Sequence, residues 1–371
     1  MSFAQNPFAG IESPFFWPFG LALSMDKQIL ETPEKSRKFF TSIIKITAAR
    51  FSSEGATPSK IIYDKPAFVL RDFSTSFAAN EIPTLIVSPY AGHAGTIADF
   101  YGKQSIVERL LQNGLTRVFC IDWRDATQKT KDYDIDDCLA GIHTAVCDMG
   151  GRVNLIGLCQ GGVLAALYAA RYSPHVEALV CAGTAFDTQT ENGAIRDLAN
   201  ALPISFYESL IEAGNGVLEG RFMLEGLKGM NPEQHIMNKF LSIYEYIDDP
   251  DYRQRNTAFE RWYLNMVDVP GHLYLQMIGQ LFKKNLFIKG EMTALGQNVK
   301  PQSIVCPVYL LAGSADDIAP KDQVFNVAGL LGTPANRVIK DLASSGHMGL
   351  FIGTRAIREN WSKIAVWLLR V

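Results

Sequence analysis

Short apolar runs alternate with amphipathic stretches through the middle of the chain. Mostly apolar runs, which indicate buried strands, occupy residues 84–87, 117–123, 153–156 and 176–182. Amphipathic segments at 103–113 and 134–147 predict helices between them, and Asp132 and Asp134 are N-cap candidates for the second helix. This alternation is typical of βαβ units, in which the strands form a parallel sheet.

The pattern differs on both sides of this region. Residues 26–54 predict a helix, and residues 61–63 and 68–73 predict an antiparallel pair of strands. Residues 197–289 carry a helical, aromatic-rich pattern without an expected strand, and sheet-like alternation returns at 308–313. We therefore expect four parts: an N-terminal arm and helix (1–59), the first part of the core (60–196), an inserted helical cap or lid (197–289) and the second part of the core (290–371).

A Gly-x-Cys-x-Gly-Gly sequence lies between the apolar run at 153–156 and a helix-forming stretch. This is the strand–turn–helix context of a nucleophile elbow, with Cys159 where serine is usual. Gly157 and Gly161 would leave room for the sharp turn, and the helix N-terminus would favour a thiolate. The alternative is a tight turn that holds an inert, buried cysteine.

A cysteine nucleophile needs a base, and the base needs a group that orients it. In the elbow architecture the acid and then the histidine follow the nucleophile along the chain. His347 lies in a glycine-flanked loop after a late expected strand and is the candidate base. Asp316 and Asp317 follow another expected strand, and one of them would orient the imidazole. Each residue alone also fits a structural role, but their order and positions favour a triad with Cys159.

The same architecture predicts how a reaction oxyanion would be bound. One donor should be the backbone N–H of Gln160, and a second should come from the loop that contains Tyr90, Ala91 and His93. His93 either lines the site or has a structural role. No set of side chains has the spacing of a metal site, so we expect no metal.

Composition narrows the class of protein. With 371 residues, 47% of them hydrophobic, the chain can bury a large core, and its net charge of −3 without a basic stripe argues against a nucleic-acid partner. Six cysteines, mostly in apolar segments, indicate a reducing, cytoplasmic location. The first 25 residues resemble neither a signal peptide nor a membrane span. Their aromatic residues predict either an arm packed on the protein or a surface for an insoluble substrate or partner chain.

These motifs resemble the superfamily of polyhydroxyalkanoate synthases and intracellular polyhydroxyalkanoate depolymerases. The resemblance covers roughly residues 60–371 and rests on residues 121–125, the Cys159 box, the aspartate loop and Gly346-His347-Met348-Gly349. It implies an α/β-hydrolase fold: a mostly parallel sheet with helices on both faces and an inserted helical cap. It also favours Asp316 over Asp317 as the partner of His347.

The two branches of this superfamily carry out opposite reactions. Synthases transfer a hydroxyacyl group from coenzyme A to the cysteine and then to a growing polyester, whereas depolymerases open the polyester. The pair Gly161-Gly162 resembles the synthases. Other stretches resemble the depolymerases: 89–93 with Thr96, 123–126, 230–232 with His235, 316–318 and 346–355.

We interpret the chain as a depolymerase-like thiol hydrolase, with a synthase as the alternative. A non-catalytic, granule-associated or ligand-binding protein and a small-molecule thiol hydrolase are further alternatives. The resemblance implies a polyester granule or hydroxyacyl-coenzyme A as partner, and coenzyme A as substrate or acyl acceptor rather than a resident cofactor. A homodimer or a second subunit would also fit, with a cytoplasmic location at or away from the granule.

Overall fold

The computed structural model describes residues 34, 38, 55–76, 81–92, 94–230, 245–246, 248–264 and 266–371. The chain forms two compact units, one of Ser53–Gly226 with Met266–Val371 and one of Met1–Ser52 with Leu227–Asn265. The aromatic arm and almost all of the helix predicted at 26–54 lie outside the described residues. The larger unit holds both parts of the predicted core together with residues 197–226 and 266–289 of the predicted cap, so this segment is divided between the units.

An eight-stranded sheet forms the centre of the larger unit, in the order β1-β2-β6-β3-β7-β8-β13-β14. β1 pairs with β2 and β2 with β6 in antiparallel fashion, whereas all other neighbours are parallel. The strands are β1 (Lys60–Asp64), β2 (Phe68–Asp72), β3 (Thr84–Val87), β6 (Val118–Trp123), β7 (Val153–Leu158), β8 (Val176–Ala182), β13 (Val308–Gly313) and β14 (Val338–Ala343). The predicted parallel sheet with an antiparallel pair at its start is therefore confirmed.

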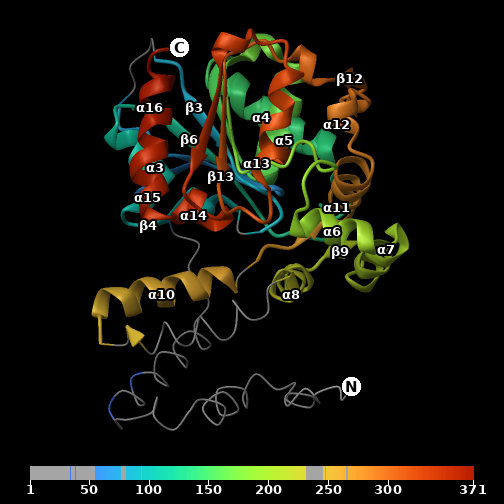
Figure 1. The fold of residues 1–371 in the computed structure, drawn as a ribbon, viewed down its shortest axis with the longest axis horizontal. Helices are drawn as coiled ribbons and strands as arrows, with labels where there is room; N and C mark the ends of the chain where they lie inside the picture. The colour runs from blue at the N-terminus through green and yellow to red at the C-terminus, as the bar shows by residue number, and fades with distance from the viewer. Residues whose placement is uncertain are drawn as a thin grey trace. The chain divides into compact units, whose positions relative to one another are not determined.

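Helices cover both faces of this sheet (Figure 1). α3 and α16 lie on one side, and α4, α5 and α13 lie on the other. The α-helices of this part of the chain are α3 (Ile106–Gln112), α4 (Ile135–Asp148), α5 (Gln160–Arg171), α6 (Ala194–Ala201), α7 (Ile204–Ala213), α8 (Gly220–Met230), α11 (Gly271–Gln276), α12 (Leu286–Lys289), α13 (Lys321–Phe325), α14 (His347–Ile352), α15 (Thr354–Ala356) and α16 (Ser362–Leu368). Together with the sheet they form the predicted α/β-hydrolase fold.

Shorter elements complete the larger unit. They are β4 (Asp99–Tyr101), β5 (Gln104–Ser105), β9 (Val217–Leu218), β10 (Val269–Pro270), β11 (Met292–Ala294), β12 (Gln297–Val299), η1 (Ala94–Ile97), η2 (Ser173–His175), η4 (Met277–Lys283), η5 (Pro301–Ser303), η6 (Asn326–Gly329), η7 (Ala335–Arg337) and η8 (Ile357–Trp361). β9 pairs with β10. The expectation that residues 197–289 lack strands is therefore wrong, because two-residue strands are too short to leave an alternating pattern in the sequence.

Two helix starts show how local side chains set the boundaries. The helix predicted from residue 103 begins at Ile106, because the Ser105 hydroxyl accepts the Glu108 N–H as an N-cap. At α4 the cap is Asp134, whose carboxylate accepts the Asp137 N–H, while Asp137 in turn accepts the Asp134 N–H. This reciprocal capping box selects Asp134 over the other candidate, Asp132.

In the smaller unit the described residues centre on α10 (Pro250–Tyr263). Asp249 caps this helix by accepting the N–H groups of Asp251 and Tyr252, and Pro250 occupies its first turn, where a missing N–H costs nothing. Lys38 Nζ donates to Asp248 Oδ1 at 2.8 Å and links the N-terminal part of this unit to the residue before the Asp249 cap.

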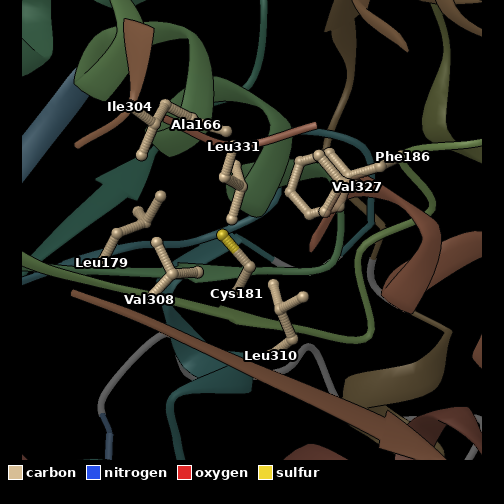
Figure 2. A pocket seen from close by; sticks show the side chains of 9 residues that line it. All are labelled: Ala166, Leu179, Cys181, Phe186, Ile304, Val308, Leu310, Val327 and Leu331. Carbon is tan, nitrogen blue, oxygen red and sulfur yellow. The ribbon is translucent and has the colours of Figure 1, made fainter. Parts of the chain in front are cut away.

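The sheet carries the main core of the larger unit. Every residue of β6, β7 and β13 is buried, as expected for strands that are covered on both faces. The core holds an apolar cavity of about 10 Å³ beside Cys181. Figure 2 shows the side chains that line it, among them Leu179 and Leu310. A void of this size and polarity has no room for a substrate and belongs to the packing of the core.

Candidate active site

Cys159 occupies the turn between β7 and α5 with a strained backbone. Its φ of 50° and ψ of −122° lie in a region that non-glycine residues rarely adopt. Two backbone hydrogen bonds hold the turn: Cys159 N donates to Ala182 O at 2.8 Å, and Gly162 N donates to Cys159 O at 2.9 Å. The neighbouring strand β8 therefore helps to fix the position of the cysteine.

The three glycines of the box are each required by a close approach. A Cβ at Gly157 would overlap the backbone of Gly162, and a Cβ at Gly161 would overlap the carbonyl oxygen of Val87 at the end of β3. A Cβ at Gly162 would overlap the hydroxyl of Thr184. The double glycine thus lets the first turn of α5 pack directly against β3 and against the loop after β8.

The structure brings Cys159, His347 and Asp316 into one hydrogen-bonded line. His347 Nε2 lies 3.2 Å from Cys159 Sγ, and His347 Nδ1 lies 2.8 Å from Asp316 Oδ2. His347 is the first residue of α14, which Figure 1 places at the lower end of the sheet, and Asp316 lies in the turn after β13. With Asp316 holding Nδ1–H, Nε2 is free to accept a proton from the cysteine.

Of the two adjacent aspartates, Asp316 is the one that faces the histidine. Its other carboxylate oxygen accepts the N–H groups of Ile318 at 3.0 Å and Ala319 at 2.8 Å. Its side chain has no exposed surface. A carboxylate that accepts from two backbone donors and an imidazole has its hydrogen-bonding capacity used in the interior, so these contacts fix its position beside His347.

His347 is buried, and its charge balance favours the imidazolium. Burial alone would lower the pKa of His347, but the Asp316 carboxylate and the Cys159 sulfur outweigh it and raise this pKa well above 6.5. Cys181 provides the contrast: burial raises the pKa of that thiol, so it stays protonated in the core. Cys159, unlike Cys181, lies within hydrogen-bond distance of an imidazole nitrogen, His347 Nε2.

The imidazole is also held by packing. Phe351 contacts it edge-on, with ring centroids 5.2 Å apart. Gly183, with a φ of 56°, is a second neighbour of this ring. It has no side chain, and a Cβ there would lie 3.1 Å from His347 Cε1. The missing side chain at Gly183 therefore leaves space for the histidine beside the cysteine.

The loop after β3 meets the nucleophile turn through the side chain of Gln160. Gln160 Oε1 accepts the backbone N–H groups of Tyr90 at 2.9 Å and Ala91 at 2.8 Å. The Tyr90 side chain is fully buried and stacks on Trp123, with centroids 5.0 Å apart, so it belongs to the core rather than to a substrate-lining surface. His93 lies outside the described residues.

Residues at the end of β6 fix the two ends of this loop. Trp123 Nε1 donates to Ser88 O at 2.8 Å, and Gly95 N donates to Asp122 Oδ1 at 2.8 Å. Asp122 in turn pairs with Arg71 at 2.7 Å. Sequence reasoning placed Asp122 and Trp123 in a family-like stretch but missed this role, because the contacts join strands that are distant in the chain.

Among the residues that the structure describes, no group of three His, Cys, Asp or Glu side chains is arranged to hold a metal ion. In the same part of the chain, no helix combines the length and apolar character needed to span a bilayer.

Comparison with known proteins places the chain in a family. A family model described as "Protein of unknown function (DUF3141)" matches residues 69–370. The chain belongs to this family. A solved structure, the monoacylglycerol lipase of Paleococcus ferrophilus, is similar to the DUF3141 chain with a TM-score of 0.52 and 18% identity, covering 82% of this chain and 98% of the lipase. This likeness supports the α/β-hydrolase fold.

Two curated relatives of the DUF3141 chain carry the name poly(3-hydroxyalkanoate) polymerase subunit PhaC. The protein from Allochromatium vinosum is 25% identical over 360 residues, covering 94% of this chain and 99% of the relative. The protein from Haloarcula marismortui is 24% identical over 377 residues, covering 95% of this chain and 76% of the relative. The predicted membership of the synthase and depolymerase superfamily, and of an enzyme class of ester hydrolases or acyltransferases, is confirmed. The relatives support the synthase alternative better than the degradative interpretation.

Proposed function

We propose that this chain is a polyhydroxyalkanoate synthase, an acyltransferase that polymerises 3-hydroxyacyl groups delivered by coenzyme A. The observation that carries the proposal is that hydrogen bonds join Cys159, His347 and Asp316 in a chain whose relatives are named as polymerase subunits. The double glycine that follows the cysteine supports the same branch.

In the first half-reaction the chain's own residues move one proton and one acyl group. His347 Nε2 takes the Cys159 proton, and the thiolate attacks the thioester carbonyl. Backbone N–H groups near the start of α5 stabilise the oxyanion of the tetrahedral intermediate. The carbon–sulfur bond to coenzyme A then breaks, the leaving thiolate takes the proton from His347, and the acyl group remains on Cys159.

In the second half-reaction His347 takes the proton of an incoming hydroxyl group. The resulting oxygen nucleophile attacks the acyl-cysteine, an ester bond forms, and the Cys159 thiolate leaves. A thioester intermediate suits this exchange, because it stays reactive toward alcohols as well as water. With water as the acceptor, the same residues would hydrolyse the acyl-enzyme, which is how a depolymerase would use them.

Two substrates assayed in parallel test the proposal: 3-hydroxybutyryl-coenzyme A and amorphous poly(3-hydroxybutyrate). A synthase releases coenzyme A and forms new polymer, and Cys159→Ala should abolish both. Cys147→Ala, which removes an exposed free thiol, is the matched control and should retain activity. Release of soluble products from the polymer, without polymer formation from the thioester, would refute the synthase and restore the depolymerase.

The proposal also concerns partners. Coenzyme A enters as the carrier of the substrate rather than as a resident cofactor. Association with a polyester granule in the cytoplasm, as a homodimer or with a second subunit, would follow from the same function. Sedimentation with polymer granules and the mass of the purified assembly measure these two properties directly.

A further inference from the structure

The side chain of Gln160 links the nucleophile turn to the loop after β3. Gln160 is the first residue of α5, directly after Cys159, and its Oε1 accepts two backbone N–H groups from a segment 70 residues earlier. A single amide oxygen with two donors at 2.9 and 2.8 Å is fully used. The residue that follows the nucleophile is therefore tied to the loop from which a second oxyanion donor is expected.

Gln160 is one of several contacts that hold the described part of this loop. The loop is anchored at its start through Ser88 and at its end through Gly95. Between these points Gln160 holds Tyr90 and Ala91, and Gly92 O accepts the Val267 N–H at 2.9 Å. Without the Gln160 oxygen, two adjacent N–H groups would lose their acceptor, and the central turn would lose its tie to α5.

These contacts also restrict which N–H groups can bind the oxyanion. The N–H groups of Tyr90 and Ala91 are occupied by Gln160 and are not available while it holds them. The N–H of Gln160 is the first of α5, one of those that a helix leaves without an intrahelical acceptor. Gly92 supplies the next N–H along the described loop, and space around its Cα is open.

We propose that Gln160 is a positioning residue whose side-chain oxygen fixes the loop after β3 against the start of α5. It thereby holds the N–H groups of Gln160 and Gly92 ready for the oxyanion. The inference rests on the proposed function in one respect, namely that the protein transfers an acyl group to Cys159. The inference predicts that removing the Gln160 side-chain oxygen slows acyl transfer to Cys159 but leaves the alkylation rate of the Cys159 thiolate unchanged.

Two reactions of the same sulfur separate these effects. Acylation by p-nitrophenyl acetate forms an oxyanion, whereas alkylation by iodoacetamide needs the thiolate but forms none. In Gln160→Met, which keeps the length of the side chain and removes the acceptor, we expect the acylation burst to slow by about tenfold to a hundredfold. This is less than the about hundredfold to thousandfold cost of removing an oxyanion donor outright, because the N–H group is displaced rather than deleted. The alkylation rate should stay at the wild-type value, and the change should fall on the rate constant at saturating substrate rather than on KM.

Gln276→Met is the matched control. Gln276 Oε1 also accepts a backbone N–H, that of Ile135 at 2.9 Å, and this variant should leave both reactions of Cys159 unchanged. If Gln160→Met fails to fold by circular dichroism, Gln160→Ala is measured in the same way.

Three results would overturn the inference. Equal acylation in variant and wild type would show that the side chain does not place a donor. Parallel loss of acylation and alkylation would show that it acts on the triad. Faster acylation would show that its oxygen obstructs the site. Because p-nitrophenyl acetate reports on the wild type even if 3-hydroxybutyryl-coenzyme A is not a substrate, failure of the proposed function remains distinguishable.

Discussion

Replacing Asp316 by asparagine keeps the shape of the side chain and changes its hydrogen bonding in a defined way. In the wild type, Oδ1 accepts the N–H groups of Ile318 and Ala319, and Oδ2 accepts His347 Nδ1–H. Asparagine has one side-chain oxygen, which we expect to accept the two backbone N–H groups, so its NH₂ group faces His347. The imidazole must then accept at Nδ1 and carry its proton on Nε2, pointing toward Cys159. In that tautomer it cannot take the cysteine proton.

The size of the effect follows from the lost charge. A carboxylate in contact with a titrating group shifts its pKa by about 1 to 3 units, or about 1.4 to 4 kcal/mol. Asp316 is a main cause of the raised pKa of His347, which burial alone would lower. We therefore expect the population of the thiolate–imidazolium pair at neutral pH, and with it the alkylation rate of Cys159, to fall by about tenfold to a thousandfold.

Alkylation by iodoacetamide, followed by mass spectrometry at Cys159, measures this change without any assumption about the substrate. Asp317→Asn is the matched control, since the same substitution one residue away leaves the contact with His347 in place and should react at the wild-type rate. Thermal unfolding of both variants checks that the fold is retained. A folded Asp316→Asn protein that is alkylated as fast as the wild type would refute the role of Asp316.

Two further predictions concern His347. Gly183→Ala places a Cβ 3.1 Å from His347 Cε1 and 3.0 Å from the Phe351 ring, at a φ of 56°. We therefore expect it to lower the free energy of unfolding by about 1 to 2 kcal/mol and to slow the acylation of Cys159. Urea unfolding and burst kinetics equal to those of the wild type would contradict this. Because the folded pKa of His347 is raised above 6.5, the imidazolium contributes stability that is fully present below pH 6.5 and is lost as the pH rises through the folded value. Unfolding curves across this range should show that loss in the wild type and less of it in Asp316→Asn, whereas parallel curves would refute the ion pair.

The sheet and the order of the triad residues could be predicted from the sequence, because both depend on local signals. Buried strands such as β7 are short apolar runs, and the glycines around Cys159 mark a turn that few other residues permit. Asp316 could be separated from Asp317 only by resemblance, since neighbouring residues share the same local pattern. The structure separates them through the Ile318 and Ala319 N–H groups, which turn one carboxylate inward.

Contacts between segments that are distant in the chain could not be predicted from local sequence patterns. The sequence predicts that the loop after β3 supplies an oxyanion donor, but it does not predict that the Tyr90 ring within this loop stacks on Trp123 inside the core. Periodicity says nothing about which way a loop aromatic will turn. The Gln160 side chain was missed for a related reason, since its partners lie 70 residues away and only the folded backbone brings them within reach.

The assembled site shows how the fold supports a strained nucleophile. A backbone conformation like that of Cys159 costs about 1 to 3 kcal/mol and persists only where the surroundings determine it. Here β8 accepts the Cys159 N–H, the Gly162 N–H closes the turn, and the fully buried strand β7 leads into it. The strained turn therefore lies at the end of the buried centre of the sheet, while His347 and Asp316 reach the same end of the sheet on segments after β14 and β13. In the proposed reaction, this division would let the reacting sulfur keep a fixed position through both acyl transfers, and the choice between an alcohol and water as acceptor would depend on which of them reaches His347.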